Sequence, residues 1–471
     1  MSATAAAAPL HRTLAGAAPP VQVFEALYGD EAHAFLYESL ESSGERGRYS
    51  FVGGRPRLVI RSRGDEVAVS RNGIVEHHRT DLLDYLRSVV IEQCEAPAAT
   101  PFPGGAVGYL AYDAVRRFES LPDDNPDDLD LPEGYFLVPD EVIAFDHAEH
   151  TSHVVLYGAA ANPTRLARIL DVVNGHVCDH EAMESDPCVA ADDGPPLGSN
   201  MSKDQFEAAV ARAQEYIRAG DIFQVVLSQR FEFDVTTGPL ELYKALRVTN
   251  PSPYMYYLSL EGVHVLGSSP EVLVKLDGRR VVSRPLAGTR PRGRTEEEDL
   301  ILAAELRADA KETAEHTILV DLARNDIGRV CDVGSVRITE LLEIERFSRV
   351  MHLVSNVEGV LREDRDAFDL LRAAFPAGTV SGAPKIRAMA IIDELEPVRR
   401  GIYAGAIGYV SADGNLDMCI AIRTIVVRGQ RGYIQAGAGV VADSLPHREY
   451  AETLNKARGL MRAVRLAEAA S

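Results

Sequence analysis

The sequence has little of what would place a protein in a membrane, on a nucleic acid or outside the cell. Its five cysteines are odd in number and scattered, without the paired spacing of a zinc site or a disulfide framework. No apolar run approaches the roughly 18 to 20 residues that cross a bilayer. Basic residues are the scarcer charge, and the net charge of −21 would repel nucleic acids and anionic membranes. We therefore expect a protein of the reducing cytoplasm that binds a small molecule or another protein.

Two segments are poor in branched apolar residues. Residues 1–20, rich in alanine, lack the charged head and apolar stretch of a signal peptide and predict a disordered tail, with a plastid transit peptide as the alternative. Residues 180–200 are polar around Asp-Asp-Gly-Pro-Pro and predict a linker. The chain thus divides near residue 195 into an amino-terminal region, 21–195, and a carboxy-terminal region, 196–471.

The two regions differ in local pattern. The first contains LVIRSRGDEVAVSRNGIVEHH, whose alternation around Gly-containing turns is typical of antiparallel hairpins. The second mixes a helical pattern that ends at a glycine, KDQFEAAVARAQEYIRAGD, with strand-like segments such as FQVVLSQRFEF. Nothing repeats at a fixed period, and strands do not alternate regularly with helices, which argues against a solenoid or a doubly wound sheet. The expected fold class is α+β.

A long helix is predicted over residues 295–327. Thr295 and Glu298 form a capping-box pattern at its start, and good helix formers fill its interior. Glu312 and Glu315 are three residues apart, so both carboxylates project from one face of this helix.

A second predicted helix, starting near His447, repeats this spacing. Glu449 and Glu452 are three residues apart, and Lys456 follows one turn later. Mg²⁺ typically takes one or two protein carboxylates together with water and an anionic substrate. Two solvated acidic faces are the alternative, but the apolar neighbours of both pairs favour a site.

A strand of small residues, Gly437, Ala438 and Gly439, precedes the second helix. Glycine exposes backbone N–H groups to the close approach of an anion. The strand lacks the third glycine of a dinucleotide-binding fingerprint, and tight structural packing explains it equally well.

Taken together, these segments resemble the chorismate-utilising enzymes, and in particular the anthranilate synthase component I family. The matching segments, within residues 200–465, include DIFQVVLSQRF, NPSPYMYYL, GSSPEVLVKL, RPLAGTRPRG, LVDLARNDIGRV, VMHLVSNVEG, FPAGTVSGAPKIRAM, GIYAGAIGYV, IAIRTIVV and AGAGVVADSLPHREYAETLNKA. The resemblance implies a large antiparallel β-sandwich with helices packed outside. It also implies a Mg²⁺-dependent lyase that makes anthranilate and pyruvate from chorismate and ammonia.

The resemblance assigns charged groups to the two carboxylates of chorismate. Glu315 and Glu452 resemble direct Mg²⁺ ligands, with Glu312 and Glu449 holding metal-bound waters, so that the metal anchors the ring carboxylate. The positions implied to grip the enolpyruvyl carboxylate or to line the ring are Gly288, Thr289, Tyr403, Arg423, Gly437, Ala438, Gly439 and Lys456.

The implied reaction has two halves: ammonia adds at ring carbon 2 as the hydroxyl leaves carbon 4, and pyruvate is then eliminated. Glu271 matches the general acid for the leaving hydroxyl, His352 a proton-transfer residue of the elimination, and Thr379 a hydroxyl donor near the ring. Without the resemblance, Glu271 would be interpreted as a surface residue and His352 as a core residue.

Two positions indicate the product. Enzymes of this family that hydrate chorismate carry a lysine where this chain has Gln224, and a neutral amide cannot serve as that base. Enzymes that aminate carbon 4 carry a nucleophilic lysine where this chain has Ala287. The resemblance therefore implies anthranilate, and the alternative is a 2-amino-2-deoxyisochorismate synthase that stops after amination.

The resemblance also implies two partners. The chain has no Gly-x-Cys-x-Gly elbow for hydrolysing glutamine, so a separate glutamine amidotransferase subunit would supply ammonia within a hetero-oligomer. L-tryptophan would be a feedback inhibitor, although Tyr37 replaces a leucine of the family's Leu-Leu-Glu-Ser motif. The alternative to a tryptophan site is that these motifs only connect the amino-terminal sheet to the catalytic core. The alternative to an active enzyme is a catalytically silent subunit that senses tryptophan. The implied tryptophan-binding residues are Glu38, Ser39, Pro253, Tyr254 and Met255.

Overall fold

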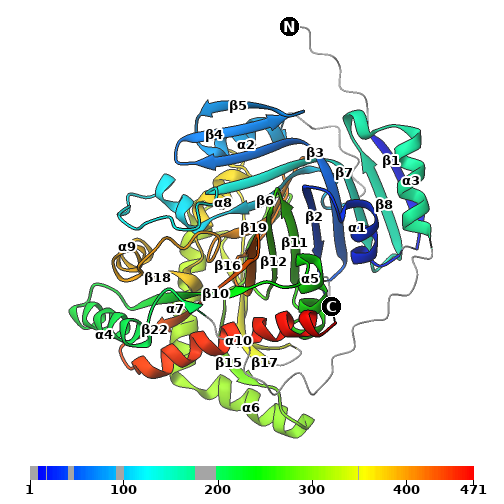
Figure 1. The fold of residues 1–471 in the computed structure, drawn as a ribbon. Helices are drawn as coiled ribbons and strands as arrows, with labels where there is room; N and C mark the ends of the chain where they lie inside the picture. Colours follow the sequence, from blue (N-terminus) through cyan, green and yellow to red (C-terminus); the bar gives the residue numbers. More distant parts are fainter. Residues whose placement is uncertain are drawn as a thin grey trace.

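The structure is a computed structural model that describes residues 9–16, 18–40, 47–91, 100–175, 198–347 and 350–470. Its strands join into one antiparallel assembly with helices around it (Figure 1). The strands are β1 (Leu10–Ala15), β2 (His33–Glu38), β3 (Tyr49–Arg63), β4 (Glu66–Arg71), β5 (Ile74–Arg79), β6 (Gly105–Leu110), β7 (Gly134–Asp146), β8 (Thr151–Leu156), β9 (Gly198–Ser199), β10 (Gln224–Asp234), β11 (Tyr254–Leu260), β12 (Val263–Ser269), β13 (Val272–Asp277), β14 (Arg280–Ser283), β15 (Leu286–Pro291), β16 (Arg337–Arg346), β17 (Val350–Val360), β18 (Gly382–Ala383), β19 (Ala406–Ser411), β20 (Leu416–Ile420), β21 (Thr424–Arg428) and β22 (Arg431–Val440). The α-helices are α1 (Pro20–Tyr28), α2 (Leu82–Ile91), α3 (Pro163–Asn174), α4 (Lys203–Ala219), α5 (Pro239–Thr249), α6 (Glu296–Ala308), α7 (Ala310–Gly328), α8 (Ala367–Ala374), α9 (Lys385–Leu395) and α10 (Pro446–Ala470).

The packing of apolar side chains defines a sandwich. One core cluster, which includes Phe35, Phe51, Phe102 and Tyr409, draws its described residues from strands and loops alone, as expected where two sheet layers face each other. Two other clusters hold helices against the sheet: α2, α7, α8 and α9 in one, and α1, α3, α5 and α10 in the other. The expected α+β fold, an antiparallel β-sandwich with helices outside, is confirmed.

Strands from both sides of residue 195 interleave. β2 lies between β3 and β11, and β6 lies between β7 and β19. Amino-terminal strands thus complete the sheet of the carboxy-terminal region. Residues 180–197 of the linker expected over 180–200 lie outside the described residues, and its end includes the short β9, which pairs with β10.

The start of the chain differs from the expected tail. β1 pairs with β8 along its whole length, from Leu10 opposite Leu156 to Ala15 opposite Thr151. Leu10 and Leu14 pack against the core cluster of α1 and α3, which stabilises this edge strand. The prediction of disorder over 1–20 is therefore wrong for β1. Residues 1–8 lie outside the described part of the chain.

The helix predicted over 295–327 is two helices, because Asp309 interrupts it. Asp309 is extended, and its carboxylate accepts the N–H groups of Lys311 at 3.0 Å and Glu312 at 3.2 Å, which caps α7. Thr295 caps α6 by accepting the N–H of Glu298 at 3.2 Å. The break places Glu312 in the first turn of α7.

β4 and β5 form the predicted hairpin. Arg71 lies opposite Ile74, which leaves Asn72 and Gly73 as a two-residue turn with φ of 51° and 80°. Asn and Gly adopt this left-handed conformation most readily, so the turn follows from the sequence.

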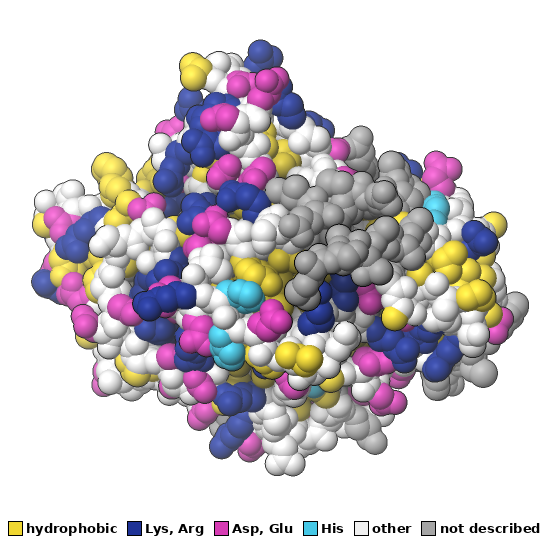
Figure 2. Space-filling model, turned by 90° about the horizontal axis from the view of Figure 1, so that it is seen from above, with side chains coloured by type: hydrophobic (Ala, Val, Ile, Leu, Met, Phe, Trp, Pro, Cys, Tyr) yellow, Lys and Arg dark blue, Asp and Glu magenta, His cyan; other side chains and the backbone are white. Residues whose placement is uncertain are grey.

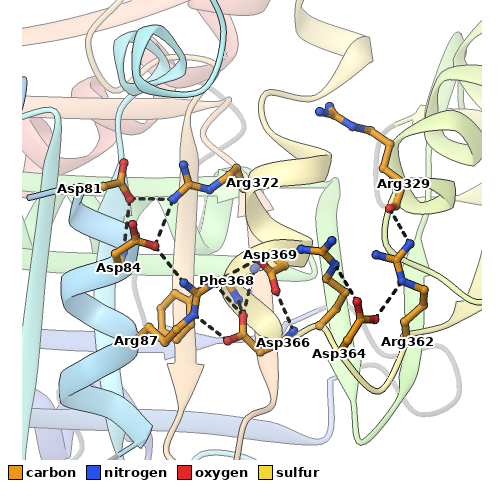
Figure 3. A network of polar contacts seen from close by, with 11 residues as sticks. Asp81, Asp84, Arg87, Arg329, Arg362, Asp364, Asp366, Phe368, Asp369 and Arg372 are labelled. Atoms are coloured by element: carbon orange, nitrogen blue, oxygen red, sulfur yellow. Dashed lines mark hydrogen bonds and ion pairs between the residues drawn. The ribbon is translucent and has the colours of Figure 1, made fainter.

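Ion pairs fasten the amino-terminal helix α2 to α8 (Figure 3). Arg87 donates to Asp366 at 2.7 Å and to Asp369 at 3.1 Å, and Arg372 donates to Asp81 at 2.8 Å. α8 leads directly into the loop that carries Thr379, so the network fixes one end of that loop.

The surface carries charges of both signs. On the face in Figure 2, acidic and basic side chains are interspersed rather than segregated. None of the described helices is both long enough and apolar enough to span a membrane.

Candidate active site

The small residues of β22 make room for two polar side chains. A Cβ on Gly437 would lie 2.6 Å from the Tyr403 hydroxyl, and a Cβ on Gly439 would lie 2.9 Å from Nε2 of Gln224. Residues 437 and 439 share one face of the strand, because side chains alternate between faces. Ala438 points to the other face, where it is fully buried. The glycines therefore let Tyr403 and Gln224 approach the same stretch of backbone.

Two cations lie beside this strand. Lys456 of α10 donates to the Gly437 carbonyl at 2.8 Å and forms an ion pair with Glu452 at 2.8 Å. Arg423, between β20 and β21, is partly buried, and its guanidinium has no hydrogen-bond or ion-pair partner among the described residues. Burial lowers the pKa of Arg423, and Glu452 and Tyr403 oppose that effect. A partly desolvated cation without a partner gains a charge-assisted contact when an anion joins it, so this part of the site suits a carboxylate.

One carboxylate of each predicted pair, Glu315 of α7 and Glu449 of α10, lies within electrostatic reach of the other. Burial raises the pKa of Glu315, and the nearby carboxylates of Glu312 and Glu449 raise it further. Burial also raises the pKa of Glu449, as does Glu452. This mutual repulsion shows that carboxylates on separate helices lie near one another.

These carboxylates fit Mg²⁺ in kind. Oε1 of Glu315 is buried and accepts no hydrogen bond within the described residues, while Lys311 lies 3.6 Å away as an ion-pair partner. Lys456 neutralises Glu452 in the same way. In the described part of the chain, no three His, Cys, Asp or Glu residues are close enough together to form a ready-made metal group. The site therefore supplies the oxygen ligands, but Lys311 and Lys456 now neutralise two of them.

Glu271 is a buried carboxyl group between β12 and β13. Burial raises its pKa to about 8, against the opposing effects of the Thr379 hydroxyl, the Leu286 N–H and Lys456. The Leu286 N–H donates to Glu271 Oε1 at 3.4 Å, and Thr379 lies in the short helical turn Gly378–Val380. Most Glu271 is consequently protonated at pH 7 and can donate a proton.

His352 of β17 lies against β15. Its Nδ1 is 2.9 Å from the Gly288 carbonyl oxygen and 3.1 Å from Oγ1 of Thr289. Burial lowers its pKa to about 4, and Arg423 and Lys456 lower it as well. The ring is therefore neutral at pH 7. Because Nδ1 must carry the proton to donate to a carbonyl, Nε2 is left as a proton acceptor.

Gly288 lies between His352 and Glu312 of α7. It sits at a bulge in the pairing of β15 with β17, with φ of 66°. A Cβ there would lie 3.1 Å from Oε2 of Glu312. The backbone between the histidine and the carboxylate pair is thus closely packed, and glycine is needed for both reasons.

The sequence did not reveal two buried ion pairs beside the site. Lys385 of α9 donates to Asp326 of α7 at 2.6 Å, and burial raises the pKa of Asp326 to about 6. Arg400 and Glu396 form the second pair. Lys385 and Asp326 lie 59 residues apart along the chain, so their pairing had no local signal. Arg400 and Glu396 are four residues apart, and their spacing was the available signal for the second pair.

The residues implied to bind tryptophan line one cavity of about 570 Å³. Tyr37 does not fill it, because its hydroxyl donates to the Gly408 carbonyl at 3.1 Å. The Glu38 carboxylate, expected to meet an ammonium group, already accepts from Tyr243 at 2.7 Å and pairs with Arg247 at 2.8 Å. The implied binding residues that line this cavity are Glu38, Ser39, Pro253, Tyr254 and Met255.

Glu271, His352, Arg423 and Lys456 lie in one electrostatically coupled region with the carboxylates of α10. The family described as chorismate binding enzyme matches residues 33–462, and the chain belongs to it.

Three similar proteins show which members of this family the chain resembles. Anthranilate synthase component 1 of Streptomyces coelicolor is 48% identical, with 98% of this chain and 90% of the relative covered. The crystal structure of anthranilate synthase component I from Streptococcus pneumoniae has a TM-score of 0.75 at 39% identity, covering 94% of this chain and 97% of the other. The menaquinone-specific isochorismate synthase of Escherichia coli has a TM-score of 0.72 at 20% identity, covering 98% and 96%, and shares the fold.

Proposed function

We propose that this chain is a lyase that converts chorismate and ammonia into anthranilate and pyruvate. The observation that carries the proposal is the convergence of Arg423 and Lys456, Glu271, and His352 beside the two carboxylate pairs. Anthranilate synthase is also the name of relatives that match nearly the whole chain. Because the alignments span nearly the full length of both proteins, they support assigning the complete activity to this chain.

Two groups of residues would hold the two carboxylates of chorismate, one by direct contacts and the other through Mg²⁺. Arg423, Tyr403 and the backbone of β22 receive the enolpyruvyl carboxylate, with Lys456 beside them. Glu315 and Glu452 would hold Mg²⁺ directly, and Glu312 and Glu449 would act through water. When bound, Mg²⁺ supplies positive charge for the ring carboxylate. Each substrate anion thereby gains a charge-assisted contact.

Glu271 serves the amination half. As ammonia bonds to carbon 2, the bond from carbon 4 to its hydroxyl breaks, and the protonated Glu271 donates to the departing oxygen. A carboxyl group with a pKa of about 8 keeps this proton at neutral pH. Thr379, beside Glu271, orients this carboxyl group for the proton transfer.

His352 serves the elimination half. Its neutral ring accepts the ring proton through Nε2 while Nδ1 stays bonded to the Gly288 carbonyl. The electron pair of the broken C–H bond completes the aromatic ring as the bond from carbon 3 to the enolpyruvyl oxygen breaks. The departing enolpyruvate takes up a proton on its methylene carbon and becomes pyruvate. Gln224 lies where relatives that activate water carry lysine, and Ala287 cannot attack the ring, so amination at carbon 2 is the chemistry these residues favour.

We also propose that ammonia comes from a separate glutamine amidotransferase subunit, that tryptophan inhibits through the cavity beside Tyr37, and that the protein works in the cytoplasm. The cavity supports inhibition because its volume of about 570 Å³ leaves room for an amino acid. The engagement of Glu38 by Arg247 means that another acceptor is needed for the ammonium group. Asp417, which accepts from Tyr254 at 2.9 Å and pairs with Lys275 at 3.4 Å, is a second carboxylate in the same cavity that could exchange partners with the ligand.

Anthranilate fluorescence tests the proposal. The purified chain with chorismate, Mg²⁺ and an ammonium salt should form anthranilate, and glutamine should replace the salt only when an amidotransferase subunit is added. Release of 2-amino-2-deoxyisochorismate without pyruvate would establish the alternative activity. Formation of neither product would refute both.

A further inference from the structure

Arg400 is a buried cation that reaches three parts of the candidate site. Its side chain is 2% exposed. Nη1 donates to the Val380 carbonyl at 2.7 Å, and Nη2 donates to the Val226 carbonyl at 2.7 Å. Glu396 accepts from Nη2 at 2.6 Å and from Nε at 2.9 Å. The planar guanidinium thus donates in several fixed directions at once, which a lysine could not reproduce.

Each contact ends beside a residue of the site. Val380 follows Thr379 in the turn that faces Glu271. Val226 lies two residues after Gln224 and opposite Gly439 in the pairing of β10 with β22.

Tyr403 provides the third contact. The guanidinium carbon of Arg400 lies 5.6 Å from the centre of the Tyr403 ring and 4.7 Å from the centre of the Tyr112 ring. Tyr403 is the side chain whose hydroxyl lies against Gly437. The cation–π contact of the buried guanidinium favours this position of the Tyr403 ring.

Glu396 extends this arrangement along β10. Its Oε1 accepts the N–H of Ser228 at 2.8 Å and the Ser228 hydroxyl at 2.9 Å. Replacing a buried ion pair by apolar groups of similar volume often costs little stability. Stability alone therefore does not require the ion pair of Arg400 and Glu396. Its directed hydrogen bonds instead fix β10, the turn Gly378–Val380 and the segment that carries Tyr403 relative to one another.

We infer that Arg400 is a positioning residue that sets Thr379 and Tyr403 relative to β10. The inference rests on the proposed function, because it takes Thr379, which lines one small pocket with Glu271, as a neighbour that acts on this acid and Tyr403 as a substrate contact. Arg400 itself touches neither the reacting atoms nor the substrate. Its loss should therefore weaken chorismate binding through Tyr403 and disturb proton donation through Thr379.

The test is Arg400→Lys in the full chain, with Arg165→Lys as the matched control. Arg165 also forms a buried pair, donating to Glu141 at 2.5 and 2.7 Å, but it lies in the amino-terminal region. We expect Arg400→Lys to raise the KM for chorismate by roughly tenfold or more, because small misplacements at a site cost that much. Arg165→Lys should leave KM unchanged even if it unfolds more easily.

The pH profile gives a second measurement. Glu271 is faced by the Thr379 hydroxyl, the Leu286 N–H and Lys456, and Thr379 favours its ionised form. If Thr379 moves away, the acid keeps its proton to higher pH, so the alkaline limb of kcat/KM should move upward in Arg400→Lys. A merely structural role would lower the active fraction without moving this limb or KM.

Arg400→Met with Glu396→Leu covers the case in which Arg400→Lys does not fold. We expect the same rise in KM and the same shift of the alkaline limb. Unchanged KM and an unchanged limb in the folded variants would overturn the inference. If the unaltered chain made no anthranilate, the proposed function would fail instead, so the two failures are distinct.

Discussion

Replacing Glu271 by Gln separates the catalytic role of this residue from its effect on stability. The carboxyl group is 5% exposed, and burial raises its pKa to about 8 from an ordinary value of 4.5. Glutamine has nearly the same shape and can donate a hydrogen bond, but it cannot give up a proton. We expect turnover to fall by about 10² to 10⁴, the usual contribution of a general acid.

The same change should make the protein more stable. At pH 7 the unfolded carboxyl is ionised and the buried one is protonated, so folding must take up a proton at a cost of about 3 kcal/mol. Glutamine does not incur this cost. For a chain of 471 residues the unfolding entropy is roughly 1 kcal/mol/K, so Tm should rise by about 3 °C.

The sign of the pH dependence follows from the raised pKa. Between pH 4.5 and about 8 the native state holds a proton that the unfolded state has lost, so the stability of the unaltered protein falls as pH rises. The advantage of Glu271→Gln should therefore grow across this window and level off above it. Circular dichroism melts at pH 5.5, 7 and 8.5 measure it, with exposed Glu305→Gln as control. A Tm difference that does not change with pH would refute the reasoning.

Three further changes test the remaining assignments. Glu315→Gln should abolish turnover with Mg²⁺ while leaving the circular dichroism spectrum unchanged, because one substrate anchor is lost; retained turnover would contradict the metal assignment. His352→Gln should let the aminated intermediate accumulate without pyruvate, which product chromatography detects; equal loss of both products would count against the role. Ser39→Phe, which fills part of the cavity, should leave basal turnover nearly unchanged and raise the tryptophan concentration needed for inhibition; an unaltered enzyme indifferent to millimolar tryptophan would remove the premise.

The helix-borne part of the site could be predicted because its information is local. The spacing of Glu312 and Glu315 fixes their shared face whatever surrounds the helix. Even the break before α7 had a signal, since Asp309 stands three residues before Glu312 in the manner of an N-cap. The identity of the opposing carboxylates needed the resemblance, because nothing local to either helix indicates that α7 and α10 meet.

What the sequence could not supply depends on contacts between distant segments. Glu38 was expected to receive an ammonium group, but Arg247 and Tyr243, more than two hundred residues away, occupy it. β1 was mistaken for a tail because its stability comes from β8, not from its own composition. In both cases tertiary pairing between distant segments decided the outcome.

The groups proposed for catalysis are held in an environment that favours their uncharged forms or leaves a charge without a partner. Glu271 keeps at neutral pH a proton that water would remove, and His352 stays neutral down to a pH at which water would protonate it. Arg423 is a partly buried cation without an ion-pair partner among the described residues. A site on mobile loops would relax these strains. Here they lie on or between strands of a single interleaved sheet, whose many ladder contacts oppose relaxation. A substrate with two carboxylates offsets part of this strain by pairing with Arg423, so the features that make the free site unfavourable are those that select its ligand.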